Sequence, residues 1–167
     1  MLDLNNVCFQ QGDFRLTADF SVSAGARVAV IGPSGGGKST LLNGIAGFIV
    51  TDLGQALWAD KPMPDHPGQR PLSILFQDHN LFPHLSVMDN VAIGISPNMR
   101  LSHSQRHEVS LALEKVGLAD KSASFPRDLS GGQQGRVGLA RVLLRQRPLL
   151  LLDEPFSALG PALKDEM

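Results

Sequence analysis

A run of residues from Gly32 to Thr40 has the composition and spacing of a phosphate-binding loop. It reads Gly-Pro-Ser-Gly-Gly-Gly-Lys-Ser-Thr and fits the pattern G-x-x-x-x-G-K-[ST]. Three consecutive glycines let successive backbone N–H groups point at one anion. We expect Lys38 to reach the β- and γ-phosphates of a nucleotide and the Ser39 hydroxyl to bind Mg²⁺. The predicted nucleotide-binding residues are Gly32, Pro33, Ser34, Gly35, Gly36, Gly37, Lys38, Ser39 and Thr40.

The elements on either side of this loop strengthen the prediction. Residues 27–31, Arg-Val-Ala-Val-Ile, are typical of a short buried strand, and residues 39–46 of a helix that ends near Gly47. A flexible glycine-rich turn that happens to precede a lysine is the alternative. The order of strand, glycine-rich turn and helix favours phosphate binding instead.

A second glycine-rich sequence, Leu129 to Gln133, opens another predicted helix. Ser130 stands where an N-cap residue is expected, and the helix should run to about Arg145. Two glycines at a helix start leave backbone N–H groups accessible to an anion. Arginines follow on this helix, but no interleaved aromatic residues accompany them, which argues against nucleic-acid binding.

Two carboxylates follow a run of four leucines. Residues 149–152 predict a strand that is buried on both faces, and Asp153 and Glu154 come directly after it. Ligands collect at this end of the strands in parallel α/β sheets. The carboxylates could merely cap the next turn, but a phosphate-binding loop in the same chain favours Mg²⁺ binding by Asp153.

The remaining chain predicts a mixture of strands and helices. His103 and His107 have the spacing of a metal pair, yet no carboxylate or cysteine cluster accompanies them, so we interpret them as surface residues. Pro161 is suited to the first position of a final helix. Further strands are predicted at residues 2–9, 14–22, 55–58 and 72–76, and further helices from Ser86 and at about 104–116.

Composition limits the class of protein. The 167 residues suggest one domain, and 43% hydrophobic with 19% charged residues suits a globular chain. A net charge of −1 gives no sign of attraction to nucleic acid or anionic lipid. Cys8 is the single cysteine, which favours a reducing compartment. No signal peptide and no apolar run of about 20 residues is present, so membrane association should depend on a partner.

The two glycine-rich sequences and Leu149–Pro155, taken in this order, resemble the ATP-binding subunits of ABC transporters. The resemblance covers Met1 to Met167. Within that family the chain is most similar to the ATPases of thiamine importers from Gram-negative bacteria. Importers of iron and polyamines share much of the same sequence and stay as alternatives. The segments that carry the closer match are Gly32–Asn43, Leu75–Val87 and Asp153–Leu159.

The resemblance implies an α/β fold of the P-loop NTPase class, with a RecA-like core sheet, N-terminal antiparallel strands and a helical subdomain. We expect a single nucleotide-binding domain over residues 1–167 that lacks its C-terminal part. Its core would comprise residues of about 1–77 and 137–167, and its helical subdomain residues of about 78–136. Two such domains would form a head-to-tail homodimer around two ATP molecules.

The resemblance also assigns roles. Glu154 would be the general base, and Gln77 and Lys38 would complete the catalytic set. Ser39, Gln77 and Asp153 would bind Mg²⁺. The γ-phosphate on the other subunit would be contacted by Ser130, Gly131, Gly132 and Gln133. The partners would be transmembrane permease subunits and, indirectly, a periplasmic substrate-binding protein, with the chain peripheral on the cytoplasmic face of the inner membrane and no nucleic acid bound.

Several positions depart from the family pattern. No residue matches the family's switch histidine, and Gly160 replaces a usual aspartate. Gln11 stands where an adenine-stacking aromatic residue is common, so Phe9 or Phe14 would have to substitute. Gly135, where glutamine is common, should weaken its helix by about 1 kcal/mol relative to alanine.

Other function classes stay open at this point. A nucleotide-binding fragment without turnover is one alternative, because the switch-histidine region is missing. A soluble ABC ATPase of DNA repair or translation usually carries coiled-coil insertions or tandem domains, which this sequence lacks. A nucleotide kinase would share the phosphate-binding loop but does not need Leu-Ser-Gly-Gly-Gln.

Overall fold

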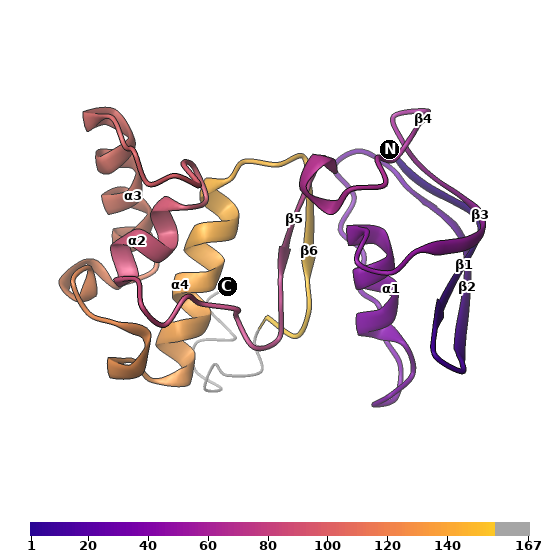
Figure 1. The fold of residues 1–167 in the computed structure, drawn as a ribbon, viewed down its shortest axis with the longest axis horizontal. Helices are drawn as coiled ribbons and strands as arrows, with labels where there is room; N and C mark the ends of the chain where they lie inside the picture. The colour runs from indigo at the N-terminus through magenta and orange to yellow at the C-terminus, as the bar shows by residue number, and fades with distance from the viewer. Residues whose placement is uncertain (156–167) are drawn as a thin grey trace. The chain divides into compact units, whose positions relative to one another are not determined.

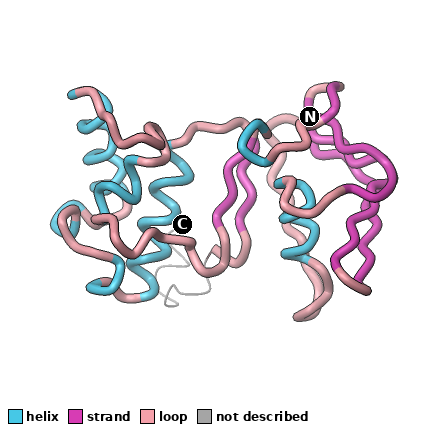
Figure 2. Tube along the Cα trace, viewed as in Figure 1, coloured by secondary structure: helices cyan, strands magenta, loops and turns pink. Residues whose placement is uncertain are grey.

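The computed structural model describes residues 1–155, which fall into two units (Figures 1 and 2). The first unit is Met1–Leu72, and the second begins at Ser73. The first contains β1 (Leu2–Gln11), β2 (Phe14–Val22), α1 (Lys38–Ala46), β3 (Thr51–Trp58), β4 (Lys61–Pro62) and the 3₁₀ turn η1 (Pro67–Gln69). From the boundary onward follow β5 (Leu72–Leu75), α2 (Val87–Ala92), α3 (His103–Lys115), η2 (Ala119–Lys121), η3 (Pro126–Asp128), α4 (Gly131–Leu144) and β6 (Leu149–Leu152).

The first unit is built on an antiparallel sheet in the order β2-β1-β3-β4. Leu4 of β1 lies opposite Phe20 of β2 and Ala56 of β3, and a bulge follows Leu4 on the way to Val7. The predicted strands at residues 2–9 and 14–22 are confirmed. The strand expected at 55–58 begins earlier, at Thr51.

Helix α1 packs against β1 through a close approach of Gly44 to Phe9. A Cβ atom on Gly44 would lie only 2.6 Å from two ring carbons of Phe9, so a larger residue would push the helix away. Phe9 is fully buried beneath it. The helix ends at Gly47, whose φ of 88° is the left-handed conformation expected of a C-terminal glycine.

Arg70 fixes this C-terminal end of α1. Its Nη1 donates to the carbonyls of Gly44 at 3.0 Å and Ile45 at 2.6 Å, and its Nε donates to the Pro64 carbonyl at 2.7 Å. The guanidinium thus bonds carbonyls that a helix end leaves open and opposes the negative end of the helix dipole. Burial lowers the pKa of Arg70, and the nearby charge of Asp65 acts in the opposite direction.

The prediction of a buried strand at residues 27–31 is wrong. The segment is not a strand, and the side chains of Val28, Val30 and Ile31 are exposed. A strand needs a hydrogen-bonded neighbour. Among residues 1–155 the paired strands form the sheets β2-β1-β3-β4 and β5-β6, and residues 27–31 belong to neither.

The second unit has a helical part formed by α2, α3 and α4. Each helix begins at a serine N-cap: Ser86, Ser102 and Ser130 accept the backbone N–H of the residue three positions later. The three helices share one apolar core, in which Val87, Val91, Ala92, Val109, Leu113, Leu118, Leu129, Val137 and Ala140 are buried. The predicted helices at Ser86, 104–116 and Ser130 are confirmed.

Two parallel strands complete the second unit. The Asp153 N–H donates to the Leu75 carbonyl at 2.9 Å, which places the carboxyl ends of β5 and β6 side by side. The expectation that residues 149–152 are buried on both faces is wrong, because Leu151 is 6% and Leu150 38% exposed. Neighbouring side chains of a strand point to opposite faces of its sheet. Within this unit, helix α4 packs against β5 of the same sheet.

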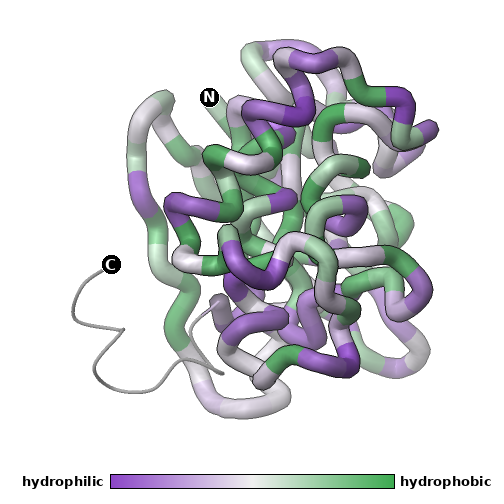
Figure 3. Tube along the Cα trace, turned by 90° about the vertical axis from the view of Figure 1, so that its left-hand side faces the viewer, coloured by the Kyte–Doolittle hydropathy of each residue, from purple (hydrophilic) through white to green (hydrophobic). Residues whose placement is uncertain are grey.

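Among residues 1–155, no helix is long and apolar enough to cross a membrane. Along the trace in Figure 3, apolar segments are short and are interrupted by polar ones. The helix predicted from Pro161 lies outside the described residues.

Candidate nucleotide-binding site

The phosphate-binding loop, Gly32–Thr40, has the backbone of an anion cradle. Gly35 and Gly37 have φ angles of 74° and 89°, which residues with a side chain rarely adopt. A Cβ atom on Gly36 would lie 3.0 Å from the Pro33 carbonyl oxygen, and one on Gly37 would lie 3.0 Å from the Phe14 ring. The loop therefore needs glycine both for its conformation and for the space around it.

Helix α1 begins at this loop without a side-chain cap. Its N-cap residue is Gly37, and no side chain accepts the first N–H groups of the helix. These groups have no partner within a helix and carry its positive end. An anion with several oxygens, such as a triphosphate, fits this arrangement.

Lys38 supplies the positive charge of the loop. Its Nζ donates to the Gly32 carbonyl at 3.0 Å and to the Pro33 carbonyl at 2.8 Å, so the ammonium lies over the first residues of the loop. An ammonium has three N–H donors, and two of them are used here. The third is available for a phosphate oxygen without displacing either carbonyl.

The second unit brings together two residues predicted to act in catalysis. Gln77 follows β5, and Glu154 follows β6, so the parallel pairing places both at the same end of the sheet. The Gln77 Nε2 lies 3.4 Å from the Glu154 Oε2, and both residues are exposed. Asp153 lies between β6 and Glu154 and is anchored through its backbone N–H to Leu75.

The Leu129–Gln133 sequence forms the predicted helix start. Ser130 Oγ accepts the Gln133 N–H at 3.3 Å, and the Gln133 side chain accepts the Ser130 N–H at 2.8 Å. This reciprocal pair is a capping box, and it uses only two of the groups at the helix start. Ser130 and Gly131 are exposed, so the positive end of α4 faces solvent.

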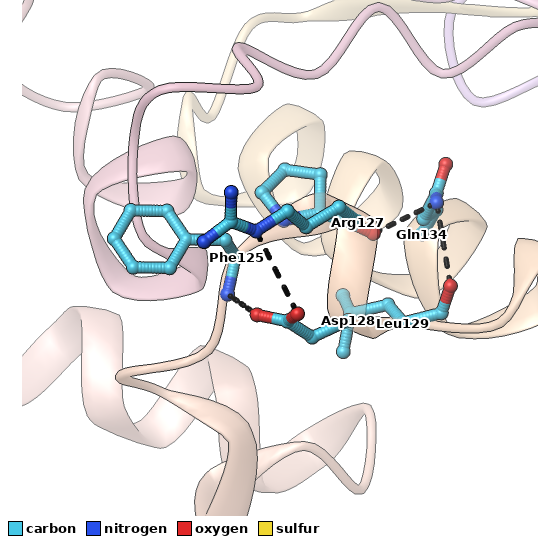
Figure 4. A network of polar contacts seen from close by, with 6 residues as sticks. Phe125, Arg127, Asp128, Leu129 and Gln134 are labelled. Atoms are coloured by element: carbon cyan, nitrogen blue, oxygen red, sulfur yellow. Dashed lines mark hydrogen bonds and ion pairs between the residues drawn. The ribbon is translucent and has the colours of Figure 1, made fainter.

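The segment before α4 is fixed by Gln134 (Figure 4). Its Nε2 donates to the carbonyls of Pro126 at 2.9 Å and Leu129 at 3.4 Å. On the same turn, the Asp128 carboxylate accepts the Phe125 N–H at 3.1 Å, and the Arg127 guanidinium lies 5.6 Å from the centre of the Phe125 ring. Side-chain hydrogen bonds therefore fix the segment from Phe125 to Leu129, which leads into α4.

Of the two aromatic residues considered for adenine stacking, Phe9 is excluded. It is fully buried, whereas Phe14 is 41% exposed and its ring lies beside Gly37 of the phosphate-binding loop. His103 and His107 are exposed on α3, and no cluster of three or more His, Cys, Asp or Glu side chains suited to a metal ion occurs in the part of the chain that is described.

The predicted site residues are divided between the two units. The phosphate-binding loop belongs to the first unit, and Gln77, Ser130–Gln133, Asp153 and Glu154 belong to the second. Sequence reasoning missed the contacts of Arg141, Asn90 and His79, which hold the segment after Gln77. No spacing pattern in the sequence connects these residues to that segment.

The chain belongs to the ABC transporter family, whose family model matches residues 16–157. The fold is that of an ABC ATPase, an ATP-binding domain of the P-loop NTPase class. This structure resembles that of a dimeric post-hydrolysis state of the ATP-binding cassette MJ0796 bound to ADP and Pi, with a TM-score of 0.86. The two sequences are 28% identical, and the match covers 99% of this chain and 79% of the other.

Curated relatives give a finer comparison. The chain is 58% identical to the thiamine import ATP-binding protein ThiQ of Cereibacter sphaeroides, over all of this chain and 73% of that protein. It is 53% identical to the protein of the same name from Ruegeria sp., again over all of this chain and 73% of the relative.

Proposed function

We propose that this chain is the ATP-hydrolysing subunit of an ABC importer that takes up thiamine or its phosphates. Relatives that are 58% and 53% identical over the whole chain carry the name of a thiamine import ATP-binding protein. The structural observation that carries the ATP-dependent part is the uncapped start of α1 behind a glycine loop, with Lys38 held over that loop.

ATP would be held by the phosphate-binding loop, Gly32–Thr40. The N–H groups of the loop and the Lys38 ammonium would bind the phosphates. Phe14 would contact the adenine ring, since it is the accessible aromatic side chain next to the loop. The Ser39 hydroxyl, Gln77 amide and Asp153 carboxylate are hard oxygen donors of the kind that Mg²⁺ prefers. Mg²⁺ would neutralise charge on the phosphates.

Glu154 would orient and deprotonate the attacking water. Its carboxylate is exposed and close to the Gln77 amide, so the two can act on one water molecule from neighbouring strands. Gln77 would then have two roles, in catalysis and in sensing the transmembrane subunit.

Two copies would dimerise head to tail. The exposed helix start at Ser130, Gly131 and Gly132, with Gln133, would contact the γ-phosphate held by the partner's phosphate-binding loop. Each ATP would thus be bound by two positive helix ends, and this shared contact would stabilise the dimer. A solved relative described as dimeric and bound to ADP and Pi supports the dimerisation in this proposal.

The helical subdomain, at about residues 78–136, would receive the permease. This subunit would lie on the cytoplasmic face of the inner membrane, and a periplasmic binding protein would deliver the substrate. Phe82 and His84 belong to an exposed edge-to-face ring pair with centres 6.0 Å apart, which suits an apolar contact with a permease segment.

Uptake into vesicles tests the proposal. The full chain is assembled with its permease and binding protein, and ATP-dependent accumulation of labelled thiamine is compared with that of iron and a polyamine. We expect thiamine uptake that disappears with Glu154→Gln. Uptake of iron or polyamine instead would contradict the substrate, and ATP-independent uptake would contradict the mechanism.

A further inference from the structure

The turn that follows Gln77 has an unusual backbone. His79 and Asn80 both have left-handed φ angles, 59° and 45°, although neither is glycine. Two such residues in succession cost free energy that surrounding contacts must offset. One backbone bond, from the His79 N–H to the Phe76 carbonyl at 2.9 Å, closes the turn.

Arg141 of α4 holds this turn from the other side. Its Nη2 donates to the His79 carbonyl at 2.7 Å and its Nη1 to the Asn80 carbonyl at 2.9 Å. The two N–H groups of one planar guanidinium thus bind the two successive carbonyls of this left-handed turn. Burial lowers the pKa of Arg141, as expected for a guanidinium that has exchanged water for carbonyl partners.

A notch on α4 receives the His79 side chain. Gly135 and Gly138 are buried on the helix face toward His79, and a Cβ atom on Gly135 would lie 3.2 Å from the imidazole Cε1. The imidazole Nδ1 is buried without a hydrogen-bond partner among residues 1–155. The ring is therefore held in the notch by packing. The glycine at position 135 therefore makes room for His79 and is more than a weak helix residue.

The turn is consequently attached to the helix that starts at Ser130. Arg141 and the glycine notch lie on α4, eleven residues or fewer from that helix start. Gln77 stands two residues before His79, between the end of β5 and the attached turn. The position of Gln77 is thereby set by the same helix that presents the Ser130–Gln133 sequence.

We propose that Arg141 is a positioning residue for the ATPase: it attaches the His79–Asn80 turn to α4, and so places Gln77 for its work beside Glu154. This inference rests on the proposed role of Gln77. It adds that Gln77 and the Ser130 helix start are joined through Arg141, so that a movement of α4 is passed to Gln77.

A double-mutant cycle on the full chain tests this inference. Arg141→Gln removes the forked donor, and we expect kcat for ATP hydrolysis to fall roughly ten- to a hundredfold, as misplacement of a catalytic group does, with ATP affinity unchanged. In a Gln77→Ala background, the same Arg141→Gln change should lower kcat further by no more than about twofold, because there is no Gln77 left to misplace.

Arg136→Gln is the matched control. Arg136 lies on the same helix and donates from Nη1 to a carbonyl at 3.0 Å, but that carbonyl belongs to Val116 at the end of α3. Its effect on kcat should be the same with and without Gln77. If Arg141→Gln prevents folding, Arg141→Lys keeps the charge without the fork and enters the cycle instead.

Equal losses of kcat from the Arg141 change in both backgrounds would overturn the inference while leaving the proposed function intact. A Gln77→Ala chain with normal kcat would overturn the role of Gln77, and the inference with it. Absence of ATP hydrolysis by the unchanged chain in its transporter would contradict the proposed function itself.

Discussion

The Gln77 amide nitrogen lies 3.4 Å from the Glu154 carboxylate, although the two residues are 77 positions apart in the chain. The parallel pairing of β5 with β6 produces this proximity, because each residue follows the carboxyl end of its strand. A long hydrogen bond between exposed groups is weak. Both side chains are therefore free to exchange this contact for one with water or substrate.

Glu154→Gln should preserve ATP binding and abolish turnover. The amide keeps the shape of the side chain but is not a base, and loss of a general base costs roughly 10²- to 10⁴-fold in kcat. Because ATP is not consumed, any dimer should persist. Phosphate release and sedimentation with Mg-ATP measure both effects. Glu114→Gln, an exposed carboxylate on α3, is the control, and loss of ATP binding by Glu154→Gln would argue for a binding role instead.

Lys38→Ala should weaken ATP binding by roughly two orders of magnitude. The substitution removes a charge-assisted donor from the loop, and such bonds contribute about 1.5–3 kcal/mol each. Titration of Mg-ATP by calorimetry measures the affinity. Lys61→Ala, an exposed lysine in β4 of the same unit, should bind normally. Retained affinity in the Lys38 variant would contradict the assignment of the phosphate-binding loop.

Phe14→Leu should raise the Kd for ATP about two- to tenfold. An aromatic stacking contact contributes about 0.5–1.5 kcal/mol beyond burial, and leucine keeps much of the apolar volume beside Gly37 without the ring. Phe14→Tyr retains the ring and should restore binding. The same ATP titration compares the variants. Equal affinity of the leucine and tyrosine variants would remove Phe14 from the adenine site.

Arg70→Met should destabilise the fold by about 2–4 kcal/mol. The side chain is 6% exposed, and its loss leaves the carbonyls of Gly44, Ile45 and Pro64 without these bonds. Urea denaturation followed by circular dichroism measures the change. Arg15→Met is the control, because Arg15 forms an exposed ion pair with Asp52 at 2.8 Å, and such pairs contribute at most about 1 kcal/mol. Similar losses in both variants would contradict a special role for Arg70.

Local signals in the sequence were sufficient for the helix starts and for the glycine-rich turn before α1. Ser86 and Ser130 form caps with backbone groups three residues away, and Lys38 and the glycines act within their own loop. Each of these predictions depends on the chain over a few residues, where side-chain chemistry limits the backbone strongly.

Contacts between distant segments were not predictable in the same way. The segment at residues 27–31 has the composition of a strand, but composition does not supply a hydrogen-bonded neighbour. The sequence predicts that Gly135 lowers the stability of its helix. Nothing in the sequence indicates that the imidazole of His79 fills the space beside this glycine. Arg141 likewise gave no sign of its two carbonyl partners.

The segment from Phe82 to Ser86 shows a different consequence of local bonding. Asn90, fully buried in α2, accepts the Phe82 N–H at 2.8 Å and donates to the carbonyls of Phe82, Leu85 and Ser86 at 3.0–3.1 Å. A single amide thus fixes the backbone of the segment that carries the exposed Phe82–His84 ring pair. If the permease docks on this ring pair as proposed, little backbone entropy would be lost on binding.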